Sequence, residues 1–167
     1  AEIGVAASSI GIFTALIYIT ASVSAPLAGT LVARHGPLRV SQRSLLWSGG
    51  GLALFASALP LLIAAGALLI GIGYGPATPA SSAILSKQAP ERMRNLIMSI
   101  RQTGVPIGGA IAGALVPALI VAYGWRPATL IVAALCALFA AALQSVRERY
   151  DHGRTEVRRA EHGSHRV

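Results

Sequence analysis

The chain has 167 residues, of which 54% are hydrophobic and only 12% carry a charge, and its mean hydropathy is +0.63. A soluble domain of this length could not hide so much apolar surface from water, so the composition argues against a soluble protein and indicates a multi-pass membrane protein. The net charge of +8 does not predict a nucleic-acid partner, because the basic residues lie between apolar segments and not on one soluble face.

The first apolar segment is uncharged from Ile3 to Ala33. A helix needs about 20 apolar residues to cross a hydrocarbon core of roughly 30 Å, so this segment predicts one membrane span, which we place at residues 8–32. Thr14, Tyr18 and Ser22 recur every four residues and therefore share one helical face. A hydroxyl-rich face turns toward other helices or a wet cavity, which makes Tyr18 a candidate substrate-binding residue.

A short basic segment, Gly29 to Val40, follows and is expected to be a loop between two spans. The next uncharged run, Ser44 to Ser86, has 43 residues, too many for one crossing and enough for two. The break between them is expected at Pro60, because proline cannot continue the helix that precedes it. These two spans are placed at residues 41–58 and 61–86.

The second of these spans contains GIGYGPATPASSA, residues 71–83. The spacing of its glycines does not fit a phosphate-binding loop, and no strand precedes them. We expect a kinked helix, whose freed backbone groups are tolerated at membrane depth only beside protein or a wet cavity. Tyr74 and Thr78 are therefore candidate substrate-binding residues, with Ser81 and Ser82 beside them. The alternative is that these side chains serve interhelical packing only.

A fourth span is predicted at residues 95–123, and Arg101 lies about two turns into it. An arginine at that depth costs a few kcal/mol and usually faces a cavity or a partner. Arg101 and its neighbour Gln102 are candidate substrate-binding residues, and Arg101 favours an organic or inorganic anion over a sugar. The alternative is that Arg101 reaches back to the membrane interface.

The same span carries small residues four positions apart, a pattern that lets helices approach closely. The glycines expected to pack helices in this way are Gly104, Gly108, Gly109 and Gly113.

The fifth span, residues 128–146, follows the turn GWRP and has almost no polar residue, so we expect it at the lipid-facing periphery. Residues 147–167 are polar and are expected to form a cytoplasmic linker or tail. The lone Cys136 and the scattered histidines lack the spacing of metal ligands, and the spans contain no Asp, Glu or His. The sequence therefore predicts no catalytic residue, no metal and no cofactor.

We thus expect an all-α, multi-pass transmembrane bundle of five membrane-spanning helices. The basic residues are divided unequally between its two sides, since of the 14 lysines and arginines only Arg126 falls among the loops of one side. Cytoplasmic loops are rich in Lys and Arg, so the basic loops and the C-terminal tail are expected in the cytoplasm of a cell whose inner membrane holds the protein. Ala1 then lies outside, as if one further helix preceded it.

The basic segment resembles the loop motif G-x-L-x-D-R-x-G-R-R that joins the second and third helices of the major facilitator superfamily. Ala33 stands at the position of the motif's Asp. The matching residues are Gly29, Leu31, Arg34 and Gly36, with Arg39 as a nearby positive charge.

The resemblance implies a partial major facilitator fold, with the second to sixth helices present and the first helix and the C-terminal half absent. It further implies a secondary transporter of a small solute, working by alternating access, in which Gly29, Arg34, Gly36 and Arg39 form a gating loop. The implied partners are a small-molecule solute, the lipid bilayer and the missing C-terminal half of the same transporter, and no nucleic acid.

Two other classes of function compete with transport. A non-transporting membrane scaffold or complex subunit would use its glycines for assembly only and would have no solvent-accessible cavity. An intramembrane enzyme is disfavoured, because the spans lack any group that could serve as a general base or nucleophile.

Overall fold

The computed structural model describes residues 7–88 and 90–164, and every regular element in this part of the chain is a helix. The expectation of an all-α membrane bundle is confirmed. The elements in chain order are α1 (Ala7–Ser24), η1 (Ala25–Leu27), α2 (Ala28–His35), α3 (Pro37–Phe55), α4 (Pro60–Gln88), η2 (Glu91–Met93), α5 (Arg94–Tyr123) and α6 (Trp125–Ser164).

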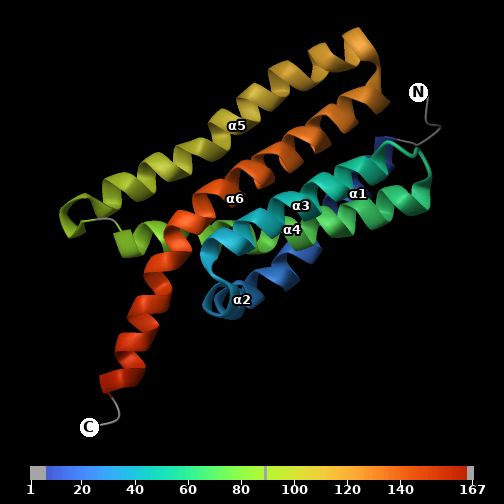
Figure 1. The fold of residues 1–167 in the computed structure, drawn as a ribbon. Coiled ribbons are helices and arrows are strands. Elements are labelled where there is room, and N and C mark those ends of the chain that lie inside the picture. The colour runs from blue at the N-terminus through green and yellow to red at the C-terminus, as the bar shows by residue number, and fades with distance from the viewer. Residues whose placement is uncertain (1–6, 89, 165–167) are drawn as a thin grey trace.

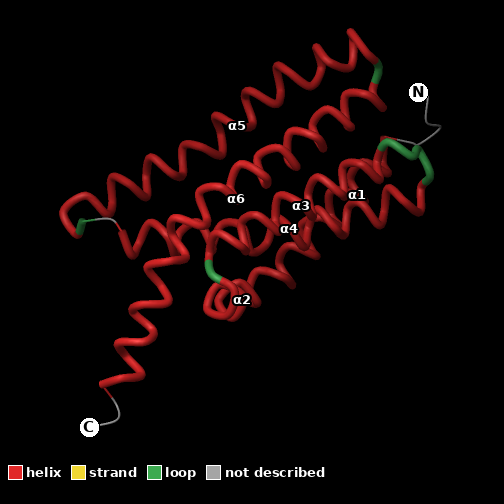
Figure 2. Tube along the Cα trace, viewed as in Figure 1, coloured by secondary structure: helices red, strands yellow, loops and turns green. Residues whose placement is uncertain are grey.

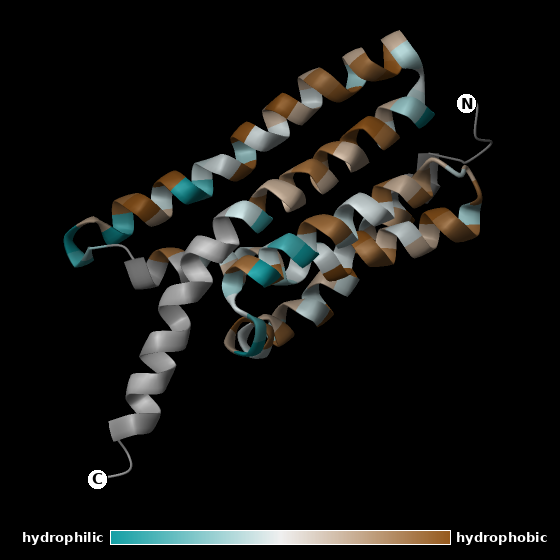
Figure 3. Ribbon diagram, in the orientation of Figure 1, coloured by the Kyte–Doolittle hydropathy of each residue, from teal (hydrophilic) through white to brown (hydrophobic). Residues whose placement is uncertain are grey.

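Four stretches of the described residues are long and apolar enough to cross a membrane. Figure 3 shows hydrophobic residues along much of α5 and along the first half of α6. Helix α3 is not among the four, because Arg39, Gln42 and Arg43 lie in its first two turns and lower its mean hydropathy. The four stretches are Gly11–His35, Pro60–Ser82, Glu91–Tyr123 and Trp125–Ser145.

The long helices run up and down, so successive connections alternate between the two ends of the bundle (Figures 1 and 2). Helix α4 packs against α1 and α3, and α3 also packs against α6. Helix α5 touches α6 and, to a smaller extent, α4. The turn at Gly36, the connection from α4 to α5 and the outgoing part of α6 lie at one end, which carries most of the arginines.

Single glycines make two of the turns. Gly36 has a φ of 88° and Gly124 a φ of 86°, a backbone region that L side chains rarely adopt. Each glycine hydrogen-bonds on both sides: the Gly36 N–H donates to the Val32 carbonyl at 3.0 Å, and the Gly36 carbonyl accepts from the Val40 N–H at 3.2 Å. The helices on either side of each glycine are therefore joined without a flexible loop.

The expected loop over residues 29–40 is thus helical on both sides of Gly36. The segment from Gly29 to His35 contains no residue that breaks a helix, since glycine only weakens one. The tail, expected as a linker over residues 147–167, continues the backbone of α6 as a helix to Ser164. It contains no proline, and its six Arg and three Glu residues favour helix. Helix α4 also continues as one helix through Pro76 and Pro79.

Glycines bring α1 and α3 into close contact with α4. A Cβ atom added at Gly71 would lie 2.6 Å from the Ile17 carbonyl of α1, and one added at Gly73 would lie 2.6 Å from the Ser44 carbonyl of α3. One turn after Gly71, Gly75 faces Ser24 in the same way. The hydroxyl of Ser24 donates to the Gly71 carbonyl at 3.2 Å. Lipid tails are as apolar as the side chains of the helices, so the hydrophobic effect does not bring the helices together. Close backbone contact of this kind holds them together instead.

Helix α6 is held to α3 by one close contact and by polar bonds. A Cβ atom added at Gly49 would lie 3.1 Å from Cβ of Cys136, so Cys136 packs against the backbone of α3. The amide of Gln42 donates to the Ala140 carbonyl at 2.9 Å and to the Gln144 side-chain oxygen at 3.1 Å. Hydrogen bonds of this kind between helices hold a bundle together where the surrounding lipid offers no alternative partner.

Helix α5 leaves its glycine stripe open. Nothing lies within 4 Å of a Cβ atom added at any of the glycines expected to pack helices, and no residue of α5 is buried. The packing role of this stripe therefore finds no partner among the described helices and stays a prediction about a helix outside them. The glycines concerned are Gly104, Gly108, Gly109 and Gly113.

We predict that Gly71→Ala lowers the thermal unfolding midpoint of the purified protein in detergent, because the new methyl meets backbone atoms of α1 that cannot move aside. Overpacking of this kind costs about 1–3 kcal/mol. Gly50→Ala is the matched control, since a Cβ atom there meets nothing within 4 Å, and alanine favours helix over glycine by about 0.5–1 kcal/mol. Equal midpoints for the two variants would contradict the assigned packing.

Candidate functional site

Tyr74, Thr78 and Ser81 form one stripe along α4. They are four and three residues apart, which places them on the same helical face. At about 1.5 Å per residue the stripe is roughly 10 Å long. Tyr74 and Thr78 are exposed and Ser81 is half-buried, so this face of α4 is open within the described chain. The stripe thus offers a row of hydroxyl groups at membrane depth.

At one end of the stripe, Tyr74 meets Tyr18 of α1. The two rings stand edge to face, with centroids 6.4 Å apart and an angle of 87° between their planes. Edge-to-face pairs of this kind are worth about 0.5–1.5 kcal/mol beyond the area that they bury. The contact brings two phenol rings together on the same open surface, where Tyr18 is 60% and Tyr74 50% exposed.

At the other end, Arg101 of α5 reaches the stripe. Its Nη1 donates to the Ser81 hydroxyl at 2.9 Å and its Nη2 donates to the Gln102 side-chain oxygen at 3.2 Å. Ser81 in turn donates to the Thr78 carbonyl at 2.9 Å. The guanidinium group is therefore held in place by one partner on α4 and one on α5.

The Arg101 guanidinium retains unused hydrogen-bonding capacity. Arginine has five N–H donors in a fixed planar arrangement, and its Nε is buried without a hydrogen-bond partner among the described residues. Glu91 in η2 is the one carboxylate whose side chain lies in the described part of the chain. The half-buried Arg101 thus places its positive charge beside hydroxyl and amide groups, an arrangement suited to a small anion.

The structure brings together all five residues that the sequence named as substrate-binding candidates. The rings of Tyr18 and Tyr74 meet edge to face. Arg101 donates to Gln102 and to Ser81, and Ser81 donates to the backbone carbonyl of Thr78. The sequence singled out Ser81 as a neighbour but did not predict its pairing with Arg101, because the two are separated by the connection between α4 and α5. The sequence signal that pointed to Ser81 was its position as a hydroxyl residue after the glycines of the same helix.

The residues predicted to form a gating loop lie at the end of the bundle that carries the turn at Gly36. Gly29 has nothing within 4 Å of an added Cβ atom, and Gly36 makes the turn between α2 and α3. Arg34 and Arg39 are exposed on either side of that turn. No group of three or more His, Cys, Asp or Glu side chains within the described ranges could hold a metal ion.

The family described as the Major Facilitator Superfamily matches residues 1–164 of the chain. Three relatives with assigned names are similar to it. The hexuronate transporter of Bacillus subtilis is 27% identical over 128 residues, which are 75% of this chain and 30% of that protein. The probable sulfoacetate transporter SauU of Cupriavidus necator is 27% identical over 136 residues, 80% of this chain and 31% of that protein.

The third relative, the 4-hydroxybenzoate transporter PcaK of Acinetobacter baylyi, is 38% identical over 58 residues, 35% of this chain and 13% of that protein. The chain thus spans about 30% of the length of the first two relatives. No solved structure matches it.

We predict that single cysteines at Thr78 and Gln102, placed in a background with Cys136→Ala, react with a hydrophilic maleimide added to the protein in membranes. The stripe would then face water inside the membrane. A cysteine at Ala67, which is 0% exposed, and one at Leu138, which is 65% exposed on α6, are the controls. Ala67 is covered by protein and Leu138 by hydrocarbon, so neither reacts. Thr78 and Gln102 as unreactive as the controls would count against a cavity and favour the membrane scaffold.

Proposed function

The chain belongs to the major facilitator superfamily, and on that premise we propose that it forms part of a secondary transporter that moves a small organic anion across a membrane by alternating access. Its five long helices α1 and α3 to α6 would supply most of one bundle. A second bundle, outside this chain, would close the cavity over the open face of α4.

The contact between Arg101 and Ser81 is the observation that supports this proposal most directly. A carboxylate or sulfonate accepts two parallel hydrogen bonds from a guanidinium group, and such charge-assisted pairs are about twice as strong as neutral ones. Arg101 is already oriented by Ser81 and Gln102, so less side-chain entropy is lost when the anion binds. In this proposal Arg101 binds the charged group of the solute.

The uncharged part of the solute would lie along the stripe toward Tyr18 and Tyr74. The roughly 10 Å between Ser81 and Tyr74 leaves room for a sugar-sized or aromatic body whose hydroxyls meet Thr78 and the two phenols. Each of the three similar proteins is named for the transport of an organic anion: hexuronate, sulfoacetate or 4-hydroxybenzoate. These names support an anionic solute without selecting one.

The proposed orientation places the end with Gly36 in the cytoplasm. Among the described residues that end carries Arg34, Arg39, Arg43, Arg92 and Arg94, whereas Arg126 lies at the opposite end. Positively charged loops remain on the cytoplasmic side of a membrane. The gating loop around Gly36 and the outgoing part of α6 would then face the cytoplasm of a cell whose inner membrane holds the transporter.

The test is uptake of radiolabelled glucuronate, sulfoacetate and 4-hydroxybenzoate by the intact transporter in proteoliposomes. Arg101→Gln is expected to raise KM for the transported anion about tenfold or more, since hydrogen bonds to a charged group contribute about 1.5–3 kcal/mol. Arg101→Lys keeps the charge but not the planar pair of donors, so an intermediate KM is expected.

A matched pair of serines provides the control. Ser81 and Ser82 both donate to the Thr78 carbonyl, at 2.9 Å and 3.0 Å, but among the hydrogen bonds of the described chain only Ser81 accepts from Arg101. Ser81→Ala is expected to raise KM several-fold, within the range of about 0.5–1.5 kcal/mol for one hydrogen bond, and Ser82→Ala to leave it unchanged. Wild-type KM in Arg101→Gln would remove Arg101 from the binding site.

A further inference from the structure

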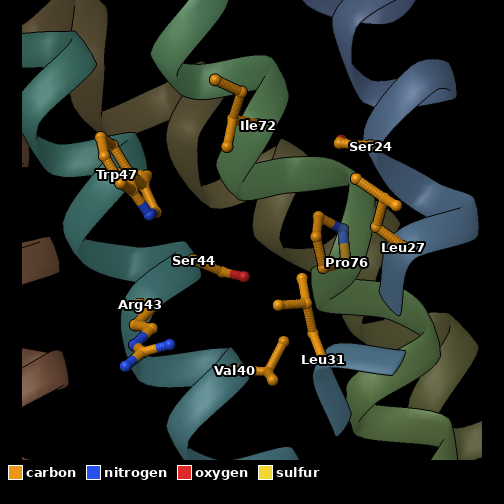
Figure 4. Close-up of a pocket in the computed structure, with 9 residues that line it drawn as sticks. All are labelled: Ser24, Leu27, Leu31, Val40, Arg43, Ser44, Trp47, Ile72 and Pro76. Atoms are coloured by element: carbon orange, nitrogen blue, oxygen red, sulfur yellow. The ribbon is translucent and has the colours of Figure 1, made fainter. Parts of the chain in front are cut away.

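The described chain has a hollow that the proposed transport does not use. It lies between α1 and α2 on one side and α3 on the other, with α4 as its floor, and its volume is about 160 Å³. Figure 4 shows its lining residues on three separate ribbons with open space between them. They are Ser24, Leu27, Leu31, Val40, Arg43, Ser44, Trp47, Ile72 and Pro76.

The hollow begins where the close glycine packing ends. Ser24 bonds to Gly71 at the last close contact of α1 with α4, and Ser44 meets Gly73 at the contact of α3 with α4. Directly after Ser24 the chain passes into the 3₁₀ turn η1, which contains Pro26. Beyond that turn, Gly29 has nothing within 4 Å of an added Cβ atom. It therefore makes no close backbone contact of the kind made by Gly71 and Gly73, and a space remains between α2 and α3.

The hollow lies on the opposite side of α4 from the hydroxyl stripe. With 3.6 residues per turn, Ile72 and Pro76 point roughly 180° away from Tyr74 and Thr78. Helices α1 and α3 occupy the two sides in between, through Gly71 and Gly73. A molecule in the hollow would therefore not touch a solute bound at Arg101, and this inference does not depend on the proposed function.

The walls of the hollow are mainly apolar, and its one charged lining residue is basic. Leu27 and Trp47 at the rim are both about half exposed, and Arg43 is exposed beside them. Arg39 lies one turn before Arg43 on the same face of α3. The lining contains no carboxylate that could neutralise Arg43. An occupant must therefore combine an apolar body with a negative charge.

The size of the hollow points to part of a larger molecule. Pockets for whole small-molecule ligands measure about 300–1,000 Å³, and this one is smaller. Arg43 lies two turns into α3, and Trp47 lies one turn deeper. This order of a basic residue above a tryptophan matches the headgroup level of a bilayer, where basic residues attract anionic lipids and the amphipathic ring of tryptophan settles.

We propose that this hollow binds an anionic phospholipid, with the phosphate on Arg43 and the upper part of one acyl chain between Trp47 and Leu27. A lipid bound at this site would contact α1, α3 and α4 at the same time. Lipid binding there would favour the arrangement of these three helices seen in this structure.

The experiment measures the quenching of Trp47 fluorescence by lipids with brominated acyl chains. The intact protein is reconstituted with Trp47 as its only tryptophan, the others being replaced by Phe, in vesicles of phosphatidylcholine mixed with brominated phosphatidylglycerol or brominated phosphatidylcholine. The expected result is a relative binding constant about fivefold higher for phosphatidylglycerol, the effect of one interfacial arginine. Arg43→Gln should abolish the preference, and Arg43→Lys should keep most of it.

The control for the rest of the membrane surface removes a charge at the other end of the bundle, in the same protein with Trp47 as its only tryptophan. Arg126 lies 5.3 Å from the centre of the Trp125 ring at the other end of the bundle, so Arg126→Gln is the matched charge removal and should leave quenching at Trp47 unchanged. Equal quenching of Trp47 by the two lipids, or an unchanged preference in Arg43→Gln, would overturn the proposal. No quenching of Trp47 by either lipid would mean that protein covers the hollow and would overturn it too.

Discussion

The fold depends on the contact of backbone with backbone around α4. A bilayer gives apolar side chains no reason to leave lipid for one another, so helices associate where small residues let their main chains approach. Gly71 and Gly75 allow α1 to approach α4 closely, and Gly73 does the same for α3. Gly51 of α3 and Gly66 of α4 continue the contact between α3 and α4 toward the start of α4. No large side chain is fully buried among the described residues, which is the consequence of a core built in this way.

This packing also decides which faces of α4 remain for function. Two of its sides are covered by α1 and α3, so two are left over. One carries the hydroxyl groups of Tyr74 and Thr78 and receives Arg101, and the other forms the floor of the apolar hollow beside Arg43. The glycines on two sides of α4 therefore separate a polar face of this helix from an apolar one, and no further helix is needed between them.

The sequence predicted the elements better than their partners. Charge-free runs and prolines indicate the long helices, and the four-residue spacing of polar groups indicates which faces turn inward. The identical small-residue pattern occurs at Gly71 and Gly75 and again at Gly104 and Gly108, yet only the first pair meets another described helix. Spacing shows that a helix can be approached, but not which helix approaches it. The bond from Arg101 to Ser81 could not be predicted for the same reason, since it joins two helices.

The one-residue turns at Gly36 and Gly124 affect how readily proteases can cut the chain. Proteases need several residues of unfolded chain in an accessible stretch, and cleavage concentrates at loop tips. At Gly36 and Gly124 the backbone remains hydrogen-bonded from one helix into the next, so neither turn presents such a stretch. The connection between α3 and α4, from Ala56 to Leu59, is longer. Within the described part of the chain, a protease would therefore cut more readily at that connection than at either glycine turn.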